Sequence, residues 1–121
     1  MLISLDYRSG QPIYLQVVEG YKRLILNGVI VENEKLPSVR ELASKLAINP
    51  NTIQRAYREL EAEGYVGSLP GKGIFALGGD AMKERESKAV YRAIHSEIQK
   101  LLDYGHDFED IIHQINARFS R

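Results

Sequence analysis

Three stretches in the first half of the chain carry hydrophobic residues at helical spacing. The first runs from Gln11 to Gly28, with Pro12 suited to its first turn, and its apolar positions share one helical face: Tyr14, Val17, Val18, Tyr21, Leu24 and Ile25. The second runs over residues 39 to about 46, and the third over residues 50 to about 63. This pattern predicts three amphipathic helices around a shared core.

Local signals mark where the second and third helices begin and end. Ser38 and Glu41 match the S-x-x-E capping box, in which the serine oxygen accepts the amide proton of Glu41 and the glutamate reaches back. Asn49 is a good N-cap residue and Pro50 suits the first helical position. Gly64 then ends the third helix.

Two short apolar runs follow, at residues 65–69 and 74–77, on either side of a Pro-Gly turn. Such a pair predicts a β-hairpin. Residues 1–10 show no periodic pattern and residues 29–37 are a connection. The order helix, short helix, turn, helix, hairpin predicts a winged helix-turn-helix domain over residues 1–77.

The remaining residues, 78–121, predict a second part joined through a hinge at Gly78 to Asp80. A long amphipathic helix is marked by Val90, Ile94, Ile98, Leu101 and Leu102, and Gly105 separates it from a second one marked by Phe108, Ile111, Ile112, Ile115 and Phe119. The fold class is therefore mainly α with a small β-hairpin, ending in a two-helix hairpin.

A hairpin of two helices has too few residues to close its own core, so it needs either the first part of the chain or a second copy of itself, and we expect dimerisation. Two copies in a four-helix arrangement would bury the expected interface residues Val90, Ile94, Ile98, Leu101, Phe108, Ile111, Ile112 and Ile115. Acidic residues among these helices argue against a membrane surface as the partner. A two-fold dimer would bind an inverted repeat, with one third helix in each of two major grooves.

The outer face of the third helix carries side chains that bind nucleic acid. Asn51, Arg55 and Arg58 lie opposite the apolar face, with Gln54 beside them. Asn and Gln pair bidentately with adenine, and Arg pairs with guanine. Thr52 and free N–H groups at the helix start are candidates for a phosphate.

The distribution of charge supports nucleic-acid binding only in one part of the chain. The chain has 16 basic and 16 acidic residues, hence a formal net charge of zero, which argues against binding nucleic acid by bulk attraction. Between Lys35 and Leu60, however, five basic residues stand against two acidic ones, a surplus of three. The absence of cysteine excludes disulfides, thiolate metal sites and thiol nucleophiles, and with no apolar run long enough for a membrane span we expect a cytosolic protein.

Several longer motifs resemble the DNA-binding domain of GntR-type bacterial transcription regulators. They are Pro12-Ile13-Tyr14-Leu15-Gln16, Leu36-Pro37-Ser38-Val39-Arg40-Glu41-Leu42-Ala43, Asn49-Pro50-Asn51-Thr52-Ile53-Gln54-Arg55-Ala56-Tyr57-Arg58-Glu59-Leu60-Glu61, Gly64-Tyr65 and Gly71-Lys72-Gly73-Ile74-Phe75. The resemblance spans about residues 11–77. The Asn-Pro-Asn-Thr start of the third helix and the short C-terminal part resemble the YtrA subfamily, in which a two-helix tail serves for dimerisation.

The resemblance implies a homodimeric bacterial transcription regulator, and we expect a repressor. It places Arg40, Asn49, Asn51, Thr52, Arg55, Gly71 and Lys72 at the DNA-contacting positions of the family. Many members carry arginine where this chain has Pro50 and Gln54, and basic residues where its wing has Leu69-Pro70. We therefore expect Lys72 to be the principal contact of the wing.

Two other functions stay open: a winged-helix protein-interaction module without DNA binding, and a regulator whose tail senses a metal or another effector. For the second, His106, Asp110 and His113 share one helical face, expected opposite the apolar stripe, at a spacing that zinc ligands use. A solvated outer face is the simpler interpretation of these residues. No constellation of residues predicts catalysis, so we expect no enzyme, no cofactor and no metal.

Overall fold

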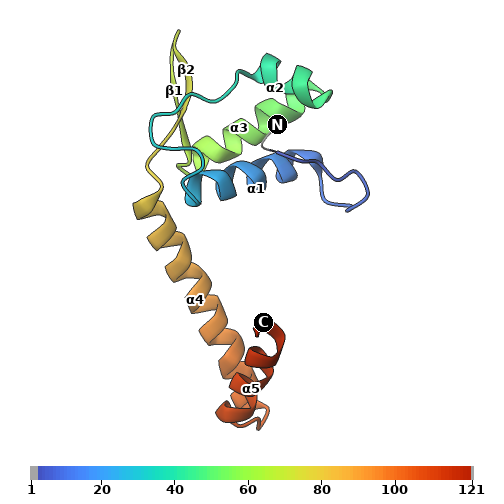
Figure 1. Ribbon diagram of the computed structural model, residues 1–121, viewed down its shortest axis with the longest axis vertical. Helices are drawn as coiled ribbons and strands as arrows, with labels where there is room; N and C mark the ends of the chain where they lie inside the picture. Colours follow the sequence, from blue (N-terminus) through green and yellow to red (C-terminus); the bar gives the residue numbers. More distant parts are fainter. Residues whose placement is uncertain (1–2, 121) are drawn as a thin grey trace. The chain divides into compact units, whose positions relative to one another are not determined.

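The computed structural model describes residues 3–120, which form five helices and a small sheet (Figure 1). The elements are α1 (Ile13–Leu26), α2 (Val39–Leu46), α3 (Pro50–Ala62), β1 (Val66–Leu69), β2 (Gly73–Ala76), α4 (Asp80–Asp103) and α5 (Phe108–Phe119). The chain separates into two compact units between Lys83 and Glu84. None of the helices in this part of the chain is long and apolar enough to cross a membrane.

The predicted cap signals operate in the structure. The Ser38 hydroxyl accepts from the Glu41 amide at 3.1 Å, and the Glu41 carboxylate accepts from the Ser38 amide at 3.3 Å, so the capping box is complete. These bonds hold the pKa of Glu41 below its ordinary value. The start expected for α1 at Gln11 is two residues early, because Pro12 is the N-cap and its carbonyl accepts the first helical bonds.

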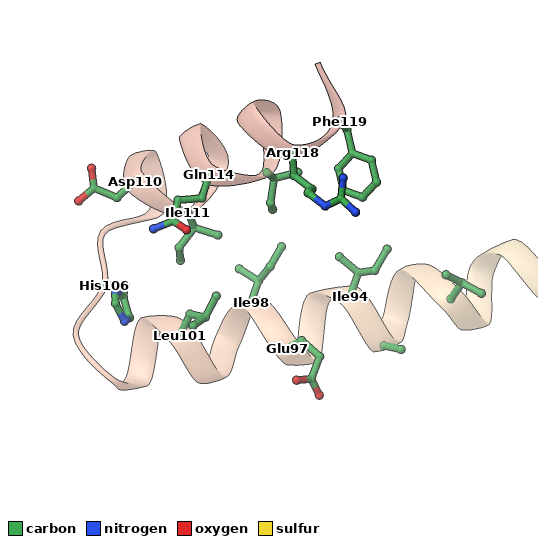
Figure 2. Close-up of a pocket in the computed structure, with 13 residues that line it drawn as sticks. Ile94, Glu97, Ile98, Leu101, His106, Asp110, Ile111, Gln114, Arg118 and Phe119 are labelled. Carbon is green, nitrogen blue, oxygen red and sulfur yellow. The ribbon is translucent and has the colours of Figure 1, made fainter. Parts of the chain in front are cut away.

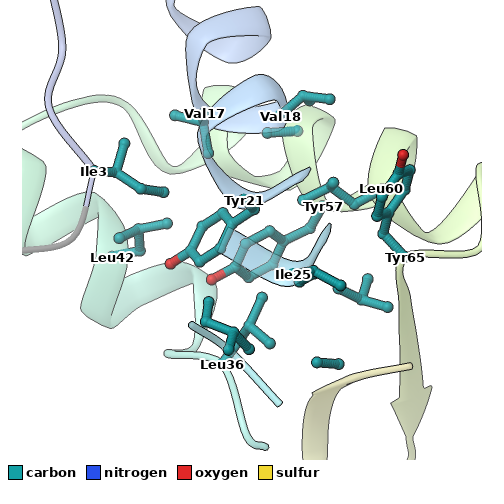
Figure 3. Close-up of a cluster of buried hydrophobic side chains, with 14 of the residues drawn as sticks. Ile3, Val17, Val18, Tyr21, Ile25, Leu36, Leu42, Tyr57, Leu60 and Tyr65 are labelled. Atoms are coloured by element: carbon teal, nitrogen blue, oxygen red, sulfur yellow. The ribbon is translucent and has the colours of Figure 1, made fainter. Parts of the chain in front are cut away.

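The core of the first unit lies where α1, α2 and α3 meet (Figure 3). α1 contributes Val17, Val18, Tyr21 and Ile25, and α3 contributes Ile53, Ala56, Tyr57 and Leu60. The rings of Tyr21 and Tyr57 meet edge to face with centroids 6.0 Å apart. Because Tyr57 also donates a 2.6 Å hydrogen bond to the carbonyl oxygen of Pro37, α3 is tied to the residue that precedes the capping box of α2.

The segment from Ile3 to Gln11, which has no periodic pattern, is packed against the first unit. Ile3 is buried in the core. Gln16 is buried too, and its amide nitrogen donates to the carbonyl oxygens of Asp6 and Gln11 while its oxygen accepts from the Asp6 amide at 2.7 Å. One glutamine therefore satisfies the backbone of the turn that leads into α1.

The wing is larger than the predicted hairpin. β1 and β2 pair antiparallel with Val66 opposite Ala76, but residues 33–36, expected to be a plain connection, bond to the other edge of β2. The Asn33 amide donates to the Ala76 carbonyl oxygen, and the Leu36 amide to the Ile74 carbonyl oxygen, each at 2.8 Å. The chain ahead of α2 is thereby fixed to the wing.

The second unit is a helical hairpin formed by the rest of α4 and by α5. Gly105, with φ of 97°, lies between the two helices, as its position in the sequence predicts. The first turn of α4 belongs to the first unit, since Met82 is buried with its core. The division of the chain therefore falls inside α4 and not at the expected residue 77.

Candidate nucleic-acid interface

The outer face of α3 is a polar surface on a helix whose other face is fixed. Ile53, Ala56, Tyr57 and Leu60 are buried, while Asn51, Gln54, Arg55 and Arg58 are exposed, as the periodicity predicts. A shallow hollow on this face is lined by Asn51, Arg55, Arg58, Glu59 and Ala62. The carboxylate of Glu59, one turn after Arg55, is a member of this hollow that the pattern of basic and amide residues does not indicate.

The backbone N–H groups at the start of α3 are not free to bind a phosphate, contrary to the expectation from the sequence. The side-chain oxygen of Asn49 accepts from the Asn51 amide at 2.8 Å, and the Asn49 carbonyl accepts from the Thr52 amide at 3.0 Å. Pro50 has no amide proton. These N–H groups are thus already used by the cap, and Thr52 itself is half-buried. A phosphate near this helix start would have to be bound by side chains.

Arg55 has a partner that the helical pattern did not indicate. Its guanidinium carbon lies 3.7 Å from the ring centroid of Tyr14, which is half-buried on α1. This is well within the range of about 6 Å at which a cation and an aromatic face attract. The sequence pattern places Tyr14 on the apolar face of the first helix, and nothing in that pattern indicates which cation its ring will meet.

Other basic residues lie on different elements of the same unit. Arg40 is exposed on α2, and Lys72 is exposed in the turn between β1 and β2, where its amide donates to the Leu69 carbonyl at 2.9 Å. Gly71 has a φ of 75°, the left-handed conformation that this turn requires. The side chain of Lys35 passes close to Gly73, where an added Cβ would lie 2.9 Å from its Cε.

The α4–α5 hairpin carries an open groove of about 650 Å³ (Figure 2). Six of the expected interface residues line it: Val90, Ile94, Ile98, Leu101, Ile111 and Ile115. Phe108 and Ile112 do not line it, while Gln114, Arg118 and Phe119 do. Ile94 and Ile98 project from α4 toward α5, whereas Glu97 points away from α5 (Figure 2).

His106 and Asp110 border this groove, so the expectation that they lie opposite the apolar stripe is wrong. For His106 the cause is the start of α5 at Phe108, which leaves this residue in the turn and off the helical spacing, whereas Asp110 lies in α5 beside the buried Ile111. Within residues 3–120, no group of three His, Asp or Glu side chains is arranged to hold a metal ion, and the carboxylate of Asp110 points away from the His106 ring (Figure 2).

Comparison with known proteins shows where this architecture recurs. The family model for bacterial regulatory proteins of the gntR family matches residues 13–76, just over half of the chain. The repressor YtrA of Bacillus subtilis (strain 168), an HTH-type transcriptional repressor, is 47% identical over 74 residues, which are 61% of this chain and 57% of YtrA. This match therefore covers little more than half the length of that relative.

Solved structures extend the likeness. The crystal structure of a transcriptional regulator from Oenococcus oeni is 33% identical, with a TM-score of 0.74, and the match covers 97% of this chain and 98% of that one. The DNA-binding domain of AraR, crystallised with the operator ORX1, is 26% identical with a TM-score of 0.56, over 63% of this chain and 98% of that one. The first likeness includes the helical hairpin, and the second comes from a protein bound to its operator.

Proposed function

The chain belongs to the gntR family of bacterial regulatory proteins, whose members regulate transcription and are not enzymes, and we propose that it is a homodimeric repressor of an inverted-repeat operator. Membership of the family makes it a DNA-binding transcription regulator. The proposal adds that the protein is a homodimer, that it represses transcription, and which of its residues contact DNA. As a regulator of bacterial genes it would act in the cytoplasm.

The outer face of α3 is the observation that carries the proposal. Asn51, Gln54 and Arg55 are exposed side chains able to pair with base edges in the major groove. They lie on α3, whose inner face is buried in the core. The core would therefore hold α3 rigidly when it enters the major groove. Arg58 adds a second exposed cation on the same face.

Phosphate contacts would come from the surrounding elements. Arg40 on α2, the Asn49 and Thr52 side chains at the start of α3, and Lys72 with Gly71 in the wing turn are the proposed positions. Such contacts set affinity and orientation, while the base edges set sequence preference. The wing turn contains Leu69 and Pro70 in place of further cations, so one phosphate contact by Lys72 is proposed there.

We propose that a second copy of the chain occupies the groove between α4 and α5. Within residues 84–120 the only buried side chain is that of Ile111, and one buried side chain does not hold a helical hairpin together. Val90 is 58% exposed, Ile94 43% and Phe119 77%. A contiguous apolar surface of this kind marks a protein interface.

Charge does not oppose the pairing of two copies. Residues 84–121 hold six basic and seven acidic side chains, so two hairpins would approach with little net repulsion. A two-fold dimer also brings two copies of α3 to two half-sites. Repression is the sign of regulation given in the name of YtrA.

Selection of bound sequences from random DNA tests the proposal. We expect an inverted repeat whose half-site centres are separated by about one helical turn of DNA or a multiple of it. Placed upstream of a reporter gene, this site should lower expression when the protein is present. Recovery of an unsymmetrical site, or of no preferred sequence, would refute the proposed mode of binding.

The groove is tested by Ile94→Asp, with Leu102→Asp as the matched control. Leu102 lies on the same helix and is 37% exposed, close to the 43% of Ile94, but it does not line the groove. We expect sedimentation to give a monomer for Ile94→Asp and a dimer for Leu102→Asp. Binding of the Ile94→Asp protein to the full operator should fall at least tenfold while binding to one half-site is unchanged. An intact Ile94→Asp dimer would remove the groove from the interface.

A further inference from the structure

The contact between Arg55 and Tyr14 joins the outer face of α3 to α1. The guanidinium carbon of Arg55 is 3.7 Å from the centroid of the Tyr14 ring, a distance typical of a planar group lying flat on an aromatic face. Tyr14 is half-buried and belongs to a helix whose inner face is in the core. The ring therefore offers Arg55 a fixed support.

A second observation is an ion pair that does not form. Arg55 and Glu59 are four residues apart on α3, a spacing at which opposite charges on a helix are neighbours and can pair, although a base ahead of the acid is the weaker of the two orientations. Among the residues that the structure describes, the side chain of Arg55 has neither an ion pair nor a hydrogen bond, and that of Glu59 has no ion pair either. The guanidinium lies on the ring instead of turning to the carboxylate.

The geometry of stacking decides what Arg55 can still do. A ring contact uses the flat face of the guanidinium, whereas its N–H donors point outward in the plane. An Arg55 paired with Glu59 would use two of those donors and would have to break the pair before meeting DNA. Held on Tyr14, it keeps all of them and loses less rotational freedom on binding.

We propose that Tyr14 is a positioning residue for sequence recognition: it holds Arg55 away from Glu59 and presents its N–H edge to a guanine in the operator. This inference rests on the proposed function, since it assumes that α3 enters the major groove. Tyr14 acts only through Arg55 and makes no base contact of its own. Bidentate donation to the O6 and N7 atoms of guanine is the pairing that the free edge fits.

The test compares variants on the operator selected for the wild-type dimer and on versions of it with each guanine replaced in turn. Arg55→Ala should lower the preference for one guanine in each half-site by about tenfold or more. Tyr14→Leu, which lets Arg55 turn to Glu59, should lower the preference for that same guanine by roughly three- to tenfold. Tyr14→Phe, which keeps the ring face, should behave like wild type.

Removal of the competing Glu59 carboxylate distinguishes positioning of Arg55 from a merely structural role of Tyr14. If Tyr14 only stabilised the fold, this removal would not change the preference for the guanine. Glu59→Gln in the Tyr14→Leu protein should restore most of the lost preference for the guanine, because no ion pair is then available to Arg55. Tyr7→Leu is the matched control, since the Tyr7 side chain is 68% exposed. If Tyr14→Leu does not fold, Tyr14→Met replaces it with an unbranched apolar chain.

The outcomes separate this inference from the proposed function. A selective loss with Tyr14→Leu that Glu59→Gln reverses supports it. An equal loss at every base position, or a loss with Arg55→Ala but none with Tyr14→Leu, overturns it and leaves DNA recognition by α3 standing. A wild-type protein without any sequence preference overturns both.

Discussion

Replacing Tyr57 by phenylalanine should change how the stability of the first unit depends on pH. The Tyr57 side chain is 2% exposed, and its hydroxyl donates a 2.6 Å hydrogen bond to the Pro37 carbonyl oxygen. Burial raises the pKa of this hydroxyl well above its ordinary 10.0, and the neighbouring Tyr21 raises it further. The unfolded chain, where the group titrates near 10, therefore loses this proton first as the pH rises.

The sign and size of the effect follow from proton linkage. Above pH 10 the unfolded state binds fewer protons than the folded state at this group, so the free energy of unfolding falls as the pH rises. Because the folded pKa lies far above 11, about 1.4 kcal/mol of stability is lost at this group by pH 11. At pH 8 the group is neutral in both states, and Tyr57→Phe removes only the hydrogen bond, at a cost of about 1–2 kcal/mol.

Urea denaturation of both proteins at pH 8, 9, 10 and 11 checks this reasoning. The wild type should be the more stable protein at pH 8, and the difference should shrink by about 1.4 kcal/mol by pH 11. Comparing the two proteins cancels the titration of the groups that do not interact with Tyr57; the pKa of Tyr21, which the Tyr57 hydroxyl lowers, is the one that the substitution also changes. Tyr7→Phe, at an exposed ring, should follow the wild-type curve. A difference that stays constant or grows with pH would refute the linkage.

Three further predictions concern single residues. Gln16→Leu removes the side-chain bonds that satisfy the turn before α1 and should cost about 2 kcal/mol in urea denaturation, so an unchanged midpoint would contradict the assigned bonds. Gly79→Ala would place a Cβ 2.7 Å from the carbonyl oxygen of Ile25, and thermal unfolding should show a loss of about 1–3 kcal/mol. Lys72→Ala should reduce the slope of log affinity against log salt concentration by about 1 without changing base preference. A change of preference at one base would show that Lys72 reads sequence.

Features set by neighbouring residues were predictable from the sequence. The capping box at Ser38 and the cap at Asn49 depend on atoms within three residues, and both form. The exposure of Asn51 and Arg58 follows from the buried positions around them on the same helix. The same cap shows the limit of the argument, because Asn49 occupies donors that had been assigned to a phosphate.

Features that depend on tertiary contacts were not predictable. The hydrogen bonding of residues 33–36 to β2 joins segments about 40 positions apart, and no local pattern indicates that a connection will bond to the edge of a sheet. Tyr14 and Arg55 are likewise on different helices, and only the packing of α1 against α3 brings them together. Helical periodicity indicates which side chains of a helix are buried. It does not indicate which residues of other elements those side chains contact.

The charge of the molecule bears on the proposed dimer. One DNA-binding unit places a local surplus of three positive charges between Lys35 and Leu60, in a chain with no net charge. With the few phosphate contacts that this allows, one half-site would be weakly bound and nonspecific binding would be low. Joining two such units turns the second binding event into an intramolecular one, which raises affinity without any new contact. Operator occupancy would then depend on the concentration of dimer, and a ligand or partner that competes for the groove between α4 and α5 would release the DNA without touching α3.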